Sequence, residues 1–100
     1  MIVYNVTVNV DEEIHENWLD WMTTKHIPQV METGCFTGSE IFRLLSPETE
    51  EGVTYSIQYY ANDLEEYEKY QIEHAAFLQS ETKEKFGGRY TAFRSVLEKV

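Results

Sequence analysis

The chain has 100 residues, enough for one domain (1–100) with a small core, and its 42% hydrophobic content argues against a disordered chain. It is acidic, and its net charge of −10 makes nucleic acid and anionic membrane surfaces poor partners. A single cysteine, Cys35, allows no intrachain disulfide, and no basic leader or long apolar run is present, so we expect a cytoplasmic protein.

The first expected element is a strand over residues 2–10, in which apolar and polar side chains alternate. One face carries Ile2, Tyr4, Val6, Val8 and Val10, and the other carries Val3, Asn5, Thr7 and Asn9. The second face presents amides and hydroxyls rather than charges, which is typical of a pocket lining or of an interface.

A helix is expected next, with Asp11 as its N-cap and acidic residues in its first turn. Apolar residues recur at helical spacing, namely Ile14, Trp18, Trp21 and Met22. Pro28 disfavours helical geometry at the residue before it, so we expect the helix to end or kink near His26. A further turn is expected before Gly34.

Residues 38–45 are expected to form a second strand, 46–52 a turn, and 53–61 a third strand. The third strand repeats the alternation of the first, with Val53, Tyr55, Ile57, Tyr59 and Ala61 opposite Thr54, Ser56, Gln58 and Tyr60. A second helix is expected to start at an Asn62 cap, with Glu65 in a partial capping box, and to end at Gly87 and Gly88. Residues 90–97 are the expected fourth strand.

The order strand, helix, strand, strand, helix, strand predicts a ferredoxin-like βαββαβ fold of the α+β class, an antiparallel sheet with both helices on one face. The apolar face of the first and third strands is then expected to pack against the helices, and no part of the chain covers the polar face. The second and fourth strands are apolar on both sides, so a second copy of the chain is the expected cover. We therefore expect a homodimer that forms a dimeric α/β barrel.

Five blocks of the sequence resemble an uncharacterised bacterial family of proteins of about 100 residues in the dimeric α/β-barrel superfamily. These blocks are residues 2–10, 18–22, 25–28, 54–59 and 86–94. The resemblance spans essentially the whole chain. It implies the ferredoxin-like fold and the dimer, and it implies no catalytic residues.

The wider superfamily includes antibiotic-biosynthesis-type monooxygenases, haem-degrading enzymes, muconolactone isomerases and ether-degradation-type proteins. Haem-degrading members use an Asn on the first strand, a Trp near the third strand and a His on the second helix. Asn5 suits the first position, but Tyr59 and Tyr60 stand near the second, and His74 lies ahead of the third, which falls near Ser80. Haem degradation is therefore disfavoured, and no cofactor is expected.

The segment Lys25-His26-Ile27-Pro28 resembles a segment of the ether-degradation-type proteins. His26 is the candidate catalytic residue, as a proton donor or acceptor near neutral pH. The simpler interpretation, which we favour from the sequence, is a histidine at the end of a helix that interacts with the last carbonyls.

Other chemistry-bearing residues have simpler explanations. His15 and His26 lie about 16 Å apart along a helix, too far to share a metal ion, so no metal site is expected. Glu12 and His15 have the spacing of half a di-iron site whose second half is missing. Trp18, and less firmly Trp21, are expected in the core. Cys35 is expected to be a small buried hydrophobe.

The candidate ligand-binding residues lie on the polar sheet face: Asn5, Thr7, Arg43, Ser56 and Gln58. Arg94 is a further possible member of this set, and the sequence leaves open whether Arg43 and Arg94 face the lumen of the barrel. Such residues orient a small polar or anionic ligand inside a barrel, or they form a hydrogen-bonded dimer interface. Three hypotheses follow. The first is a dimeric barrel that binds a small molecule or serves as an accessory module; the second is a cofactor-independent monooxygenase- or isomerase-type enzyme; the third is a purely structural dimerisation module.

Overall fold

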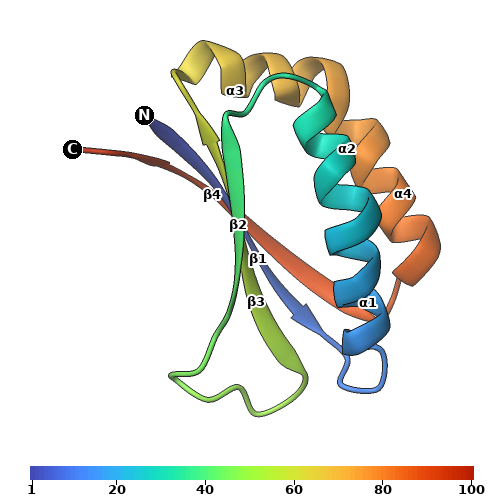
Figure 1. The fold of residues 1–100 in the computed structure, drawn as a ribbon. Coiled ribbons are helices and arrows are strands. Elements are labelled where there is room, and N and C mark those ends of the chain that lie inside the picture. The colour runs from blue at the N-terminus through green and yellow to red at the C-terminus, as the bar shows by residue number, and fades with distance from the viewer.

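A computed structural model describes residues 1–100 as two layers, a four-stranded sheet and a pair of long helices that cover one face of it (Figure 1). The strands are β1 (Ile2–Val10), β2 (Gly38–Arg43), β3 (Val53–Ala61) and β4 (Tyr90–Glu98). They pair antiparallel in the order β2-β3-β1-β4. The predicted ferredoxin-like fold is confirmed, although β2 ends two residues earlier than predicted and β4 ends one residue later.

Each long helix contains a five-residue π-helical segment. The first helix runs through α1 (His15–Trp21), η1 (Met22–His26) and α2 (Ile27–Glu32), and the second through α3 (Leu64–Tyr70), η2 (Gln71–Ala75) and α4 (Ala76–Phe86). In η1 the Ile27 N–H donates to the Met22 carbonyl five residues back. Pro28, just beyond η1, has no N–H to donate to the helix ladder, whereas η2 forms the same wider turn without a proline. The helix therefore continues past His26 with a changed register instead of ending there.

Both predicted helix caps are wrong. Asp11 precedes a short turn, and the residue at the N-cap of α1 is Ile14, which makes no side-chain cap. The Asp11 carboxylate instead accepts a hydrogen bond from Arg89 at 2.7 Å. Asp63, not Asn62, caps α3, because its extended backbone lets its Oδ1 accept the N–H three residues on at 2.9 Å.

The core lies between the sheet and the helices, and the apolar side chains of β1 and β3 point into it. It is built from 17 buried side chains, which include Tyr4, Val8, Val10, Trp18, Met22, Val30, Cys35, Phe36, Ile57, Tyr59, Tyr70 and Leu78. Strand register settles the two arginines that the sequence left open. Arg94 lies opposite Val6, and Arg43 lies opposite Tyr55, so both belong to the helix side of the sheet.

The other face of the sheet, here called the open face, has no cover within the chain. One row across it, in cross-strand register, is Phe42, Ser56, Thr7 and Phe93, and the next is Glu40, Gln58, Asn5 and Ser95. Glu40 is the one charged residue among the strand positions of this face. Phe93 is 70% exposed and Phe42 45%. None of the helices has the length and apolar character that crossing a bilayer requires.

Candidate functional site

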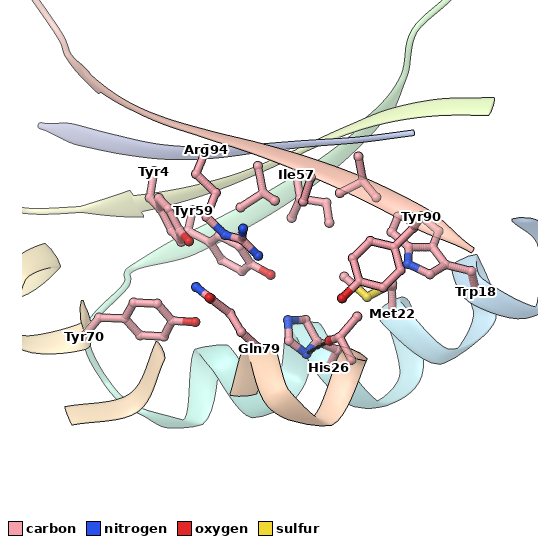
Figure 2. Close-up of a pocket in the computed structure, with 14 residues that line it drawn as sticks. Tyr4, Trp18, Met22, His26, Ile57, Tyr59, Tyr70, Gln79, Tyr90 and Arg94 are labelled. Atoms are coloured by element: carbon pink, nitrogen blue, oxygen red, sulfur yellow. Dashed lines mark hydrogen bonds between the residues drawn. The ribbon is translucent and has the colours of Figure 1, made fainter. Parts of the chain in front are cut away.

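A cavity lies between the two layers, where β1, β3 and β4 face η1 and α4 (Figure 2). Its volume, measured for the centre of a water-sized molecule, is about 40 Å³. This figure counts only the positions that the centre of such a molecule can take, so the space that an occupant fills is larger, and the cavity can hold a small molecule. Most of the wall is apolar, and its polar members are His26, Gln79, Thr82, Arg94, the indole of Trp18 and the hydroxyls of Tyr4, Tyr59, Tyr70 and Tyr90.

The cavity opens between α4 and β4. A surface groove at this place is lined by Ala76, Gln79, Ser80, Lys83, Tyr90, Ala92 and Arg94, and four of these residues also line the cavity. Because β4 is an edge strand, no further strand closes this side. Lys83 and Arg94 place two positive charges at the entrance of a protein whose net charge is −10. A small anion therefore meets a locally favourable potential there.

Arg94 is the cation of the cavity. Both ion pairs in the structure belong to Arg89, so no carboxylate of this acidic chain neutralises the Arg94 guanidinium. Its charge reaches the cavity wall, because it contributes to the lowered pKa of His26 and opposes the rise that burial gives to the pKa of Tyr70 and Tyr90. An unpaired guanidinium beside an apolar wall is suited to a carboxylate or phosphate oxygen.

Tyrosines close the cavity near Arg94. The ring centroid of Tyr4 lies 5.9 Å from that of Tyr59 and 5.8 Å from that of Tyr70. Figure 2 shows the Tyr59 and Tyr70 hydroxyls, the Gln79 amide and the Arg94 guanidinium converging on one region. Burial raises the pKa of Tyr59 and of Tyr70, so both hydroxyls stay protonated and can donate.

His26 forms part of the cavity floor. Its Nδ1 lies 3.3 Å from the Thr82 hydroxyl of α4, and its ring stacks on Trp21 at 5.5 Å. The other ring nitrogen, Nε2, lies on the cavity side in Figure 2. Burial, and secondarily Arg94, lowers the pKa of His26 to about 4, so the imidazole is neutral at neutral pH. The favoured sequence interpretation, a histidine at a helix end, is wrong because the helix continues into α2.

The π-helical segment η1 places His26. Trp18, Met22 and His26 all line the cavity although they are spaced four residues apart. In an uninterrupted α-helix, each four-residue step rotates a side chain by about 40° around the axis, so the third would turn away. The wider turn of η1 offsets this drift. The wider turn of η1 therefore helps to direct His26 at the cavity.

The predicted ligand-binding residues lie outside this cavity. Asn5, Thr7, Ser56 and Gln58 belong to the open face. The Asn5 amide is already engaged, because it donates to Thr7 at 3.0 Å and accepts from Ser56 at 2.6 Å. Arg43 sits at the exposed end of β2, in a groove beside the turn that leads to β3. The structure thus brings the four open-face residues together and places Arg43 apart from them.

Sequence reasoning named Arg94 only as a possible member of the polar sheet face, and it missed Gln79 and Thr82 as possible site residues. A signal for the side that Arg94 takes exists, because it follows Tyr90 and Ala92 at the two-residue period of a strand. Of the three residues that the sequence predicted in the core, Trp18 and Cys35 are buried and Trp21 is half-buried. No group of three or more metal-ligating side chains occurs in the structure.

The fold and the site together define a ferredoxin-like α+β protein with a small, mostly apolar cavity between its helices and its sheet. The chain belongs to the DUF4286 family, a domain of unknown function, whose sequence model matches residues 1–100. No curated protein sequence matches the chain.

Solved structures similar to this chain share its fold. An ethyl tert-butyl ether degradation (EthD) family protein from Bacillus halodurans C-125 superposes with a TM-score of 0.71 at 17% identity, over 100% of both chains. A dimeric ferredoxin-like protein from an uncultured marine organism gives 0.60 at 13% identity, over 99% of this chain and 97% of the other. The de novo designed protein Foldit4 gives 0.53 at 13% identity, over 99% and 98%. Identities this low establish the fold alone.

Proposed function

We propose that the protein binds a small anionic molecule in the cavity between its helices and its sheet. The observation that carries this proposal is the Arg94 guanidinium, which has no carboxylate partner and converges with the Tyr59 and Tyr70 hydroxyls inside a mostly apolar wall. Each of these groups donates hydrogen bonds, and none brings a negative charge. A carboxylate is the simplest group that accepts from all of them.

The charge of the rest of the chain and the size of the cavity limit which molecules this site can bind. Elsewhere the chain repels anions, because acidic residues outnumber basic ones eighteen to eight. The cavity volume of about 40 Å³, measured for the centre of a water-sized molecule, limits the occupant to a small molecule such as a short carboxylic acid. The proposed ligand is therefore a short acid rather than a nucleotide or a haem.

Titration calorimetry with pentanoate and with its uncharged amide, pentanamide, tests the anion site. We expect wild type to bind pentanoate and to bind the amide at least about tenfold more weakly, because only the acid carries the charge. Arg94→Met should abolish that preference. Arg89→Met is the matched control, since Arg89 is a surface arginine that contacts only Asp11 and Glu13. Equal binding of acid and amide by wild type would overturn the proposal.

We further propose that the protein is a homodimer joined through the open face. Support comes from the near absence of charge on this face, with Glu40 as its one charged strand residue, and from the exposed Phe42 and Phe93 at its edges. The similar marine protein is described as dimeric. In such a dimer the hydrogen-bonded residues Asn5, Thr7, Ser56 and Gln58 belong to the interface rather than to a ligand site, and Arg43 lies at its margin.

A second candidate function is proton transfer on the bound acid, with His26 as the base. The observation that favours it is the neutral imidazole whose Nε2 faces the cavity beside the anion site. Exchange of the methyl hydrogens of pyruvate in D₂O, followed by proton NMR, provides the test. Wild type should accelerate the exchange, and His26→Gln should not, while its pentanoate affinity stays within about twofold. Equal exchange rates in the two proteins would remove His26 from any catalytic role.

A further inference from the structure

The cavity contains a donor that the anion site leaves unused, the indole N–H of Trp18. The side chain is 1% exposed, and its Nε1 has no hydrogen-bond partner. Buried polar groups in folded proteins are nearly always hydrogen-bonded, because an unsatisfied one costs about 1–3 kcal/mol. In Figure 2 this nitrogen lies on the ring edge that faces the cavity, beside Met22 and Tyr90. The Trp18 N–H is therefore positioned to donate to an occupant of the cavity.

Trp18 and Arg94 stand at different points along the cavity. Trp18 packs on Tyr55 at 5.1 Å between ring centroids, and Tyr55 lies opposite Val8 in the sheet. Arg94 lies opposite Val6. Two residues along a strand span roughly 6.6 Å, so the strand positions level with Trp18 and with Arg94 differ by about that length along the sheet. Figure 2 shows the same arrangement, with Arg94 and the tyrosine cluster toward one end and Trp18 at the other.

The chemistry at the Trp18 end differs from that at the Arg94 end. An indole N–H only donates, so its partner must be an acceptor. Arg94 is the single cation among the lining residues, and the residues beside Trp18, Met22 and Tyr90, bring no positive charge. A second charged group would be buried there without a counter-charge, at a high cost. The acceptor that fits is a neutral oxygen.

We propose that the ligand of this cavity is a short oxo acid, whose carboxylate binds at Arg94 and whose carbonyl oxygen accepts the Trp18 N–H. This assignment rests on the proposed anion site and names the class of molecule that the site takes. The carbonyl oxygen supplies the acceptor that Trp18 lacks without adding a donor that the apolar wall would leave unpaired. A plain carboxylic acid of equal length fills the same space and leaves the N–H unsatisfied.

Three probes of equal chain length separate the two ends: 4-oxopentanoate, pentanoate and 2-pentanone. We expect 4-oxopentanoate to bind at least about tenfold more tightly than pentanoate, because a site built around a hydrogen bond discriminates against the analogue that lacks it. We expect 2-pentanone, which has no carboxylate, to bind more weakly than either acid. Trp18→Phe, which removes the N–H, should make the two acids bind equally.

Nitrogen–proton NMR of the wild-type protein reads the Trp18 bond directly, even if Trp18→Phe fails to fold. The chain has two tryptophans and so two indole N–H signals, and Trp21→Phe assigns them. We expect 4-oxopentanoate to shift the Trp18 signal downfield, and pentanoate to leave it nearly unmoved. If both acids bind equally and leave this signal unchanged, the oxo-acid assignment is overturned while the anion site stands. If neither acid binds, both proposals are overturned.

Discussion

His26 makes the stability of the fold depend on pH. In the folded protein its pKa is about 4, because of burial and then of Arg94, against 6.5 for an ordinary histidine. Between these two values the unfolded chain binds more protons than the folded one, so the free energy of unfolding rises with pH across this window. Acidification from 6.5 to 4 removes up to roughly 3 kcal/mol through this one residue, and above 6.5 its effect is constant.

Urea unfolding of wild type and of His26→Gln, from about pH 7 to about pH 4.5, measures this effect. The wild-type free energy of unfolding should fall more steeply on acidification than that of the variant. Carboxylates titrate in both proteins, so the difference between the two curves isolates His26. Parallel curves would show that the imidazole is solvated in the folded state.

The elements of this fold follow from sequence to different degrees. The strands were predictable, because β1 and β3 alternate strictly between a core side and a polar side. The π-helical segments were not, since the width of a helical turn depends on how the helix packs; Pro28 pointed only to a disturbance near His26. The facing of Arg94 was equally undetermined, because β4 is apolar on both sides and only pairing with β1 fixes its register.

The cap of the second helix offers a test at the scale of one element. Asp63 accepts the N–H of the first helical turn at 2.9 Å, whereas the adjacent Asn62 makes no such bond. We expect Asp63→Ala to lower the free energy of unfolding by about 1 kcal/mol, the usual value of an N-cap, and Asn62→Ala to change it by much less. Urea denaturation measures both. A larger loss in Asn62→Ala would place the helix start one residue earlier.

The cavity belongs to the whole molecule, which is why the sequence did not indicate it and pointed instead to the opposite face of the sheet. Its wall combines residues from β1, β3, β4 and both long helices, and its volume depends on how their side chains meet. The alternation of polar residues on β1 indicated Asn5 and Thr7 instead, and these residues form hydrogen bonds on the open face. The alternation of apolar and polar residues along a strand indicates which face of the sheet a side chain lies on. Whether a cavity remains depends on how side chains from all the elements pack together.

The net charge of the chain affects how two copies would associate. Each chain carries −10, so two copies repel at long range, whereas the open face contributes one charged strand residue, Glu40. Apolar contact and shape must therefore drive association through this face. We expect added salt to strengthen the dimer by screening the repulsion, measured as a shift of the dissociation constant in sedimentation equilibrium. Dissociation by salt would indicate an interface held by ion pairs.

Substituting two exposed phenylalanines, one on the open face and one on α4, tests which surface forms the dimer. Phe93, 70% exposed, lies on the open face of β4, and Phe77, 66% exposed, lies on α4. Phe93→Glu should convert a dimer into a species of 11.8 kDa in light scattering at micromolar concentration, because it buries a charge in the interface. Phe77→Glu, the same change at equal exposure, should keep the dimer. If only Phe77→Glu dissociates it, the helices rather than the sheets form the interface, and the open face needs another partner.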